Sequence, residues 1–308
     1  MGISAGLGIA NFPFEDTRGF WRWVDLCEAG GVDSLWQSDR IISADPHLEC
    51  MSVMAALAGG TKRIKFGMNV ASLGLRDPVL TAKSCATIDV LSDGRLLPAF
   101  GVGSALSRDY VATNTPTQGR GNRSAEGLEI ISRLWQETDV TFEGKYYQLD
   151  RATIAPRPVQ NPLPLWVGGS APAAVDRTAR WGTGWQAGIE SPLQVAPVIA
   201  AIKETLPKYN RTIDDDHFGA GFAFRFGDRD EPIIKRYEEM LQKRLNREPT
   251  DLYAVGNSDI LALAAKFHRA GVHKFILRPI ASDAEDMIRQ TKLLIEQTLP
   301  DFKGISTM

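Results

Sequence analysis

The sequence predicts an α/β protein folded as a (β/α)8 barrel with insertions. Strand-like and helical segments alternate along the 308 residues and make about eight β/α units, the number in a closed barrel. Residues 95–102 are apolar on both faces after the first residue, which is typical of a parallel strand covered on both sides. Alternation by itself indicates only the α/β class, because a doubly wound open sheet gives a similar pattern.

No break in composition divides the chain, so we expect a single domain over residues 1–308. Two segments fall outside the repeat. Alternating aromatic residues around Glu143-Gly144 predict a hairpin insertion at about 138–163. A charged amphipathic pattern predicts a helical insertion at about 229–252.

Short apolar runs predict the strands, and periodic apolar residues with start signals predict the helices. Between 17 and 30, Phe20, Val24 and Cys27 fall on one helical face. Asp77-Pro78 starts the helix at 77–91 in the favoured order, a cap followed by proline. The expected strands cover residues 3–10, 33–38, 64–70, 95–102, 164–167, 184–188, 219–226 and 274–280. The other expected helices cover residues 47–60, 119–137, 171–181, 192–209, 231–247, 259–270 and 283–302.

Residues 164–170 (PLWVGGS) predict a turn that binds phosphate. A buried strand runs through Gly168 and Gly169 into a helix that starts near Pro172, and glycine lets the backbone approach a ligand closely. Ser170 can cap this helix and offer its hydroxyl. The helix N-terminus presents free N–H groups and the positive end of a dipole to an anion. An ordinary strand-to-helix turn has the same local pattern and stays open as the alternative.

A barrel gathers its chemistry at the C-terminal ends of its strands. The residues expected there are Asp39-Arg40, residues 69–72, Gly103-Ser104, Gly168-Gly169-Ser170 and Arg278. They suit a cofactor that lies across the barrel mouth. Strand ends are polar in any barrel, so simple solvation explains them equally well.

Composition excludes several classes of function. With 35 Lys and Arg against 37 Asp and Glu, the net charge of -2 gives no basic surface for nucleic acid. No apolar run is long enough to cross a bilayer, and the N-terminus lacks a basic signal-peptide region. Three cysteines without metal-ligand spacing suit reduced core thiols. We therefore expect a cytoplasmic protein with no membrane partner and no metal site.

Eight blocks of sequence cover nearly the whole chain. They are CEAGGVDSLWQSD (27–39), TKRIKFGMNV (61–70), RDPVLTAKSCATIDVLSDGRL (76–96), GVGS (101–104), EGLEIISRLW (126–135), VTFEGKYYQL (140–149), PRPVQNPLPLWVGGS (156–170) and AGVHKFILRP (270–279). In their order and spacing these blocks resemble the bacterial-luciferase-like flavin oxidoreductases, which include FMN monooxygenases and deazaflavin (F420) enzymes.

The resemblance implies a homodimeric barrel that holds a flavin over its mouth. It places the flavin phosphate at Gly169 and Ser170, where the strand-to-helix argument expects an anion. It implies a cis peptide with a β-bulge on the third strand, between Asn69 and Val70 and behind the central ring. It also implies a contact of Asp39 with the ring or its polar edge. The other residues expected to bind the cofactor are Gly103, Ser104 and Gly168.

Two positions depart from the family pattern. Many members have histidine where this chain has Arg40. Arginine stays protonated, so Arg40 can stabilise an anionic substrate or intermediate but cannot cycle a proton; a salt bridge to a neighbouring acid is an equal alternative. Deazaflavin sugar-phosphate dehydrogenases carry a glutamate just after the position of Gly103, where this chain has Ser104 followed by Ala and Leu.

Among the four histidines, His47 is the best candidate for an acid or base, because it is expected at the start of a helix close to the mouth. Arg40 and His47 are thus the expected catalytic residues. A solvated polar role for His47 stays open.

The resemblance favours a monooxygenase that takes reduced FMN from a separate flavin reductase and uses O2 to oxygenate a small organic substrate. The first alternative is F420-dependent hydride transfer on the same scaffold, for which Arg40, Arg108, Arg120 and Arg123 supply cations. The second is a flavin-binding protein without turnover.

Overall fold

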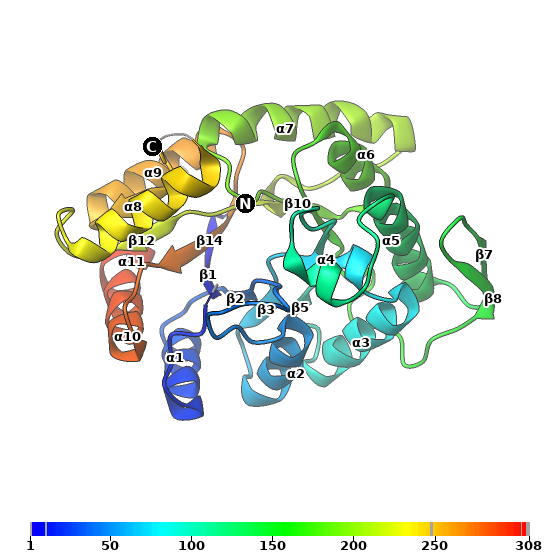
Figure 1. The fold of residues 1–308 in the computed structure, drawn as a ribbon, viewed down its shortest axis with the longest axis horizontal. Coiled ribbons are helices and arrows are strands. Elements are labelled where there is room, and N and C mark those ends of the chain that lie inside the picture. The colour runs from blue at the N-terminus through cyan, green and yellow to red at the C-terminus, as the bar shows by residue number, and fades with distance from the viewer. Residues whose placement is uncertain (1, 10, 247–248, 303, 306–308) are drawn as a thin grey trace.

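The computed structural model describes residues 2–9, 11–246, 249–302 and 304–305. Figure 1 shows the strands gathered at the centre with helices around them. Residue 10 of the first expected strand and residues 247–248 of the expected helical insertion lie outside the described residues. The same holds for residues 1, 303 and 306–308 of the expected domain.

A curled parallel sheet forms the centre of the fold. Its strands are β1 (Ser4–Ile9), β2 (Ser34–Gln37), β3 (Lys65–Met68), β4 (Ala71–Ser72), β5 (Leu96–Leu97), β6 (Ala99–Gly101), β9 (Trp166–Gly168), β10 (Gly184–Gln186), β11 (Phe218–Ala220), β12 (Ala223–Arg225), β13 (Tyr253–Val255) and β14 (Lys274–Pro279). They pair in the order β4-β6-β9-β10-β11-β14-β1-β2-β3-β5, and β12 pairs with β13 and β14.

Three of the expected strands are divided into two pieces each: β3 leads into β4, β5 into β6, and β11 into β12. Proline lacks an N–H, and Pro98 separates β5 from β6. Strands β3 and β4 are two halves of one barrel strand, and β5 and β6 are two halves of the next. Because β3 pairs with β5 and β4 pairs with β6, the two ends of the sheet meet and the sheet closes on itself. The described residues therefore form a ring of eight parallel strands, and the predicted (β/α)8 barrel is confirmed.

Helices follow the strands and cover the outside of the ring (Figure 1). Their bounds are α1 (Thr17–Ala29), α2 (Cys50–Gly60), α3 (Pro78–Leu91), α4 (Arg108–Ala112), α5 (Arg120–Gln136), α6 (Pro172–Trp181), α7 (Pro192–Thr205), α8 (Pro232–Leu245), α9 (Asn257–Arg269), α10 (Ala284–Leu293) and α11 (Leu299–Phe302). The start of α3 is as expected, since the Asp77 carboxylate accepts the Leu80 N–H at 2.8 Å and Pro78 follows it. None of the helices in the described ranges is long and apolar enough to span a bilayer.

Helix α2 starts later than expected. The Glu49 carboxylate accepts the backbone N–H of Ser52 at 2.7 Å and caps the helix, which begins at Cys50 rather than at residue 47. His47 therefore lies in the loop before α2 and not in its first turn.

The core has two layers. The larger layer lies between the sheet and the helices and includes Leu35, Val167 and Phe275. The smaller layer contains Trp36 and Trp166, with ring centroids 6.2 Å apart. Its other members are Leu97, Ala99, Ile276 and the partly buried Val70. Because side chains alternate along a strand, these residues fill the inside of the barrel.

The two expected insertions are present as local structure. Antiparallel β7 (Val140–Glu143) and β8 (Gln148–Ala152) form the hairpin, which stands at the edge of the molecule (Figure 1). Helix α8 follows β12 and has only Ile234 and Leu241 buried, as expected of a charged amphipathic helix. Strand β13, which pairs with β12, was not expected from the sequence.

Candidate functional site

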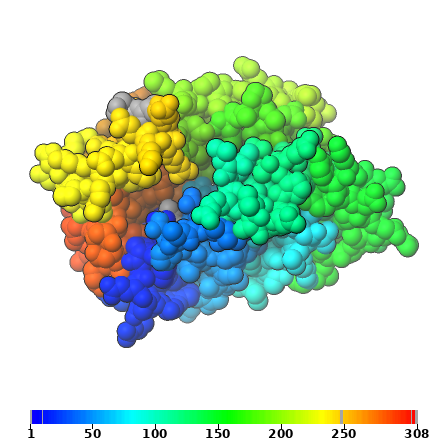
Figure 2. All heavy atoms as spheres, in the orientation of Figure 1, coloured from blue at the N-terminus to red at the C-terminus, as the bar shows by residue number. Residues whose placement is uncertain are grey.

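The C-terminal ends of the strands open into a hollow. Figure 2 shows it between α8 (yellow), the segment that follows β2 (blue) and the segment around α4 (blue-green). These three segments connect strands to helices on the same side of the barrel. This mouth is where the sequence places the candidate site.

Glycines form the floor of the mouth around Val70. A Cβ added at Gly101 would lie 2.8 Å from Val70 Cγ2, and one added at Gly168 would lie 3.0 and 3.1 Å from the two Val70 methyl groups. Both positions therefore need glycine while Val70 stays where it is. The floor beside Val70 is smooth and apolar, which fits one face of a planar ring.

The peptide between Asn69 and Val70 is cis, as the family resemblance implies. It lies between β3 and β4, and the Asn69 N–H donates to Gln37 O of β2 at 2.8 Å. The expected bulge therefore lies at the centre of the floor.

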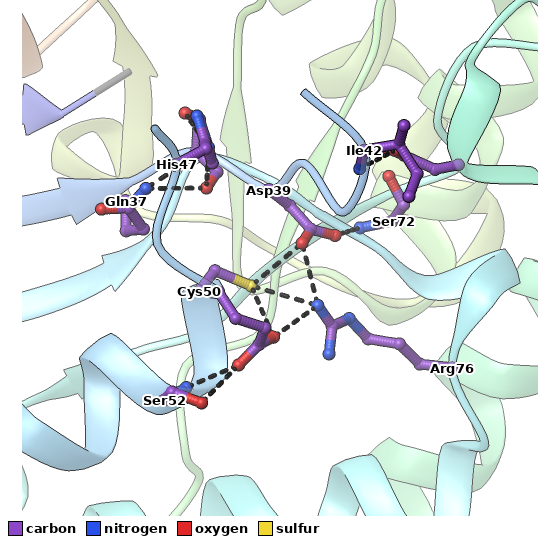
Figure 3. Close-up of polar contacts among 11 residues, drawn as sticks. Gln37, Asp39, Ile42, His47, Cys50, Ser52, Ser72 and Arg76 are labelled. Atoms are coloured by element: carbon purple, nitrogen blue, oxygen red, sulfur yellow. Dashed lines mark hydrogen bonds and ion pairs between the residues drawn. The ribbon is translucent and has the colours of Figure 1, made fainter. Parts of the chain in front are cut away.

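The Asp39 carboxylate links β2 to this bulge (Figure 3). It accepts the Ser72 N–H and the Arg76 Nη2–H, each at 2.8 Å, and its side chain is 2% exposed. Breaking such a buried, hydrogen-bonded pair leaves an unpaired charge and typically costs about 3–5 kcal/mol. Asp39 thus fixes the end of β2 against β4, and its expected contact with the cofactor stays a prediction.

Asp39, Glu49 and Cys50 lie within ligand distance of one another, an arrangement that could suit a metal ion. Arg76 already occupies this place: its Nη2 lies 2.8 Å from Asp39, 2.9 Å from Glu49 and 3.3 Å from Cys50 Sγ (Figure 3). The guanidinium supplies the positive charge that a metal would bring. Burial, with Asp39 adjacent, raises the pKa of the Cys50 thiol well above its usual range, which suits an inert cysteine.

His47 lies against the end of β2. Its Nε2 is 3.1 Å from both the backbone oxygen and the hydroxyl of Ser38 and 3.4 Å from Gln37 Nε2. Its Nδ1 is buried and has no hydrogen-bond partner among the described residues. His47 therefore keeps one ring nitrogen without a protein partner near the mouth, and its catalytic role stays a prediction.

Arg40 is exposed. Its guanidinium makes no ion pair or side-chain hydrogen bond within the described part of the chain. The expected alternative, a salt bridge to a neighbouring acid, is therefore not found among these residues, and binding of an anion stays a prediction.

The expected phosphate turn differs from prediction at Ser170. Helix α6 is capped at Ala171 and has Pro172 at its start, so the expected capping role of Ser170 is wrong. The Ser170 hydroxyl instead donates to the Glu190 carboxylate, which also accepts the Gly188 N–H at 2.6 Å. Gly169 has φ 111°, which requires glycine. Contact of Gly169 and Ser170 with a cofactor phosphate stays a prediction.

Gly103 and Ser104 follow β6, the strand that pairs with β9 before this turn. Gly103 has φ 65°, and a Cβ there would lie 3.0 Å from Ser72 Oγ and 3.2 Å from the Tyr110 ring. Ser104 is exposed, and its Oγ accepts the Leu106 N–H at 3.1 Å. Arg120 at the start of α5 donates to Gly103 O at 3.4 Å. The structure therefore joins Gly103 to Ser72 and to the first turn of α5.

Arg177 of α6 is a buried cation without a partner. The residue is 8% exposed and makes no ion pair or side-chain hydrogen bond with any described residue. Its Nη1 lies 3.6 Å from the position of a Cβ on Gly121, next to Arg120. Burial lowers the pKa of the Arg177 guanidinium, against the opposing charge of Asp176. Arg120, Arg177 and the N-terminus of α5 thus bring positive charge together, and we call this pair of arginines the cationic corner.

Several site residues were not expected from the sequence: Arg76, Glu49, Arg177 and Glu190. Arg76 directly precedes the Asp77-Pro78 helix start and is the first residue of the family-like block at 76–96. This position is the local sequence signal that could have identified it. Glu49 and Glu190 bind residues about twenty or more positions away, Arg76 and Ser170, and Arg177 is buried by packing against α5.

Comparisons with known proteins agree with this geometry. The model of the family described as luciferase-like monooxygenase matches residues 4–293. The F420-dependent glucose-6-phosphate dehydrogenase of Kineococcus radiotolerans is 34% identical over 193 residues, which cover 60% of this chain and 57% of that relative. The chain thus spans less than two thirds of this curated relative.

Two solved structures share the fold over nearly their whole length. The monooxygenase RslO1 from Streptomyces bottropensis has a TM-score of 0.83 at 20% identity and covers 97% of this chain and 100% of its own. An F420-dependent secondary alcohol dehydrogenase, in complex with an F420-acetone adduct, has a TM-score of 0.82 at 18% identity and covers 98% and 99%.

Proposed function

Because this chain belongs to the luciferase-like monooxygenase family, we propose that it is an F420-dependent oxidoreductase that transfers a hydride between the deazaflavin and a small organic substrate. The sequence alone ranks an FMN monooxygenase first and this activity second. The F420-dependent relative favours the reverse order. The chain is a luciferase-like oxidoreductase in either case.

The structural observation that carries the proposal of an anionic cofactor is the unpaired, buried guanidinium of Arg177. A buried charge without a partner costs several kcal/mol unless an opposite charge accompanies it. The tail of F420 is polyanionic, and Arg120 of the cationic corner donates to Gly103 O, beside one of the residues expected to bind the cofactor. Two guanidinium groups also match the charge of a single FMN phosphate, so the order of the two cofactors rests on the F420-dependent relative.

The floor around Val70 fits the ring of either cofactor. Bound F420 would supply a two-electron carrier that takes or gives a hydride. The protein would position its ring over Val70, with Gly101 and Gly168 allowing close approach. Asp39 would keep this floor in place through Ser72.

Proton movement needs a separate group. His47 is our proposed acid or base, because its Nδ1 has no partner among the described residues while its Nε2 is held against Ser38. Arg40 stays protonated and would bind charge instead.

Glucose 6-phosphate does not follow from the relative's activity. The glutamate of those dehydrogenases has no counterpart in residues 104–106. The first carboxylate after Gly103 is Asp109, which accepts the Ile42 N–H at 2.7 Å and so holds the loop after β2. We propose a different substrate on the same scaffold.

The direct test is a titration of the purified protein with F420 and, separately, with FMN, followed by fluorescence. We expect saturable binding of F420 with an affinity at least tenfold higher than that for FMN. Tight binding of FMN alone would favour the second candidate, a monooxygenase supplied by a flavin reductase, to which the fold of RslO1 lends support. Binding of either cofactor without turnover of any substrate would favour a carrier protein.

A further inference from the structure

Three arginines face the mouth on the side away from the cationic corner. Arg40 follows β2, Arg244 lies in the last turn of α8, and Arg278 lies in β14. Arg40 and Arg244 are exposed and Arg278 is half-buried. None of the three makes an ion pair or a side-chain hydrogen bond in the ranges that the structure describes.

Arg278 points into the barrel mouth. Side chains alternate along β14, and Ile276 belongs to the interior core layer, so Arg278 is the next interior-facing residue. A Cβ on Gly8 would lie 3.1 Å from Arg278 Cγ and 3.7 Å from its Cδ. The absence of a side chain at Gly8 therefore gives the stem of Arg278 its path toward the mouth.

The three arginines come from neighbouring parts of the mouth. Strand β2, which precedes Arg40, and strand β14, which contains Arg278, both flank β1, and helix α8, which contains Arg244, follows β12, the partner of β14. In agreement with this placement, burial and then the positive charges of Arg40 and Arg278 lower the pKa of Arg244. The helix dipole favours a cation at the C-terminal end of α8, which explains Arg244 alone but not its convergence with the other two.

This arginine triad, Arg40, Arg244 and Arg278, stands opposite the cationic corner. The triad lies around β1, and Arg177 of the corner lies in α6, which follows β9. In the ring of eight strands among the described residues, β9 is four strands away from β1 in either direction. A ligand held at the corner and extending over Val70 would leave the triad free. Three unpaired like charges repel, and an anion that binds all three would relieve that repulsion.

We infer that the arginine triad is the subsite for an anionic group of the substrate, a phosphate ester or a carboxylate. The planar, forked guanidinium matches both groups with paired hydrogen bonds. Ile41 and Met240, each 44% exposed, lie next to Arg40 and one turn before Arg244 and offer apolar contact for the rest of the molecule. The inference rests on the proposed function for the reaction, but the binding of the anion can be tested without it.

The test is isothermal titration of the full chain with inorganic phosphate and with malonate, without cofactor. We expect Arg278→Gln and Arg244→Gln each to weaken binding of the preferred anion at least tenfold. Lys243→Gln is the matched control, since Lys243 is exposed, adjacent to Arg244 and equal in charge; we expect less than a twofold change. Preference for phosphate or for malonate identifies the chemistry of the substrate's anionic group.

Arg177→Gln separates the two cationic sites. If this substitution abolishes anion binding while the triad variants keep it, the anion binds at the corner and the inference is overturned. The same follows if neither anion binds to the wild-type protein. If the triad variants lose the anion but the wild-type protein does not bind F420, the proposed function fails and the subsite stands.

Discussion

Replacing Arg177 with methionine should make the protein more stable and its cofactor binding weaker. Methionine keeps the unbranched apolar stem of this residue, which is 8% exposed, but lacks the charge that is unpaired within the described residues. An unsatisfied buried polar group costs about 1–3 kcal/mol, and more when charged. We therefore expect the free energy of unfolding of the cofactor-free protein to rise by about 1–3 kcal/mol.

Cofactor affinity should change in the opposite direction. A hydrogen bond to a charged group contributes about 1.5–3 kcal/mol, which corresponds to roughly a 10- to 150-fold loss of affinity for F420. Urea unfolding measures the first effect and fluorescence titration with F420 measures the second. Damage to the fold would lower both the free energy of unfolding and the affinity for F420. An increase in the first with a decrease in the second therefore indicates a binding site and not a folding defect.

The matched control is Arg180→Met on the same helix. Arg180 pairs with Glu129 at 3.3 Å and lies over the Trp181 ring, and its side chain is 47% exposed. An exposed pair of this kind contributes about 0–1 kcal/mol, so stability should fall slightly and F420 affinity should not change. If Arg177→Met instead destabilises the protein and leaves F420 affinity unchanged, the cationic corner is not an anion site and the reasoning is refuted.

Three other substitutions test the floor, the phosphate turn and the acid stability. Gly168→Ala would place a Cβ 3.0 Å from Val70, so we expect it to weaken F420 binding at least tenfold in the same titration; unchanged affinity would contradict the floor. Glu190→Gln removes a negative charge beside the proposed phosphate contact and should tighten F420 binding by about 2- to 10-fold, whereas weaker binding would show that the carboxylate helps to hold the cofactor. Asp286 is 8% exposed; burial would raise its pKa, but hydrogen bonds, chiefly from Arg225, hold it below the ordinary 3.8. The ionised Asp286 carboxylate therefore stabilises the fold above pH 3.8, and this contribution is lost as the pH falls further. We expect Asp286→Asn to lower the free energy of unfolding by about 3–5 kcal/mol at pH 7 and by progressively less in acid, as measured by urea unfolding. A difference that does not depend on pH would contradict this.

The barrel could be predicted because its signals are local. The Asp77-Pro78 start, the apolar run at 95–102 and the strand through Gly168 each follow from residues close in sequence. The cis peptide after Asn69 is different. Nothing in the residue pair indicates it, and only the resemblance to a family with that feature made it an expectation.

The errors at the site arise from partners distant in sequence. Ser170 has the residue type and position of a helix cap, but Glu190, twenty residues later, accepts its hydroxyl. Arg177 has the sequence of an ordinary helical arginine, and its burial depends on α5 packing against α6. Pairings of this kind are set by tertiary packing, which a local pattern does not contain.

The net charge of -2 gives no basic surface over the whole chain, yet the mouth contains two separate groups of arginine. Charge acts locally, because exposed charges more than about 10 Å apart are largely screened at moderate salt. In our proposal the corner at Arg177 binds the cofactor's anionic tail and the triad binds the substrate's anionic group, so the reacting ends of both meet over Val70. Arg40 takes part in that positioning and stays charged throughout, which leaves proton transfer to His47. Raising the salt concentration should therefore weaken the binding of both ligands without altering the pH dependence of turnover, and a parallel change in that pH dependence would contradict the division of roles.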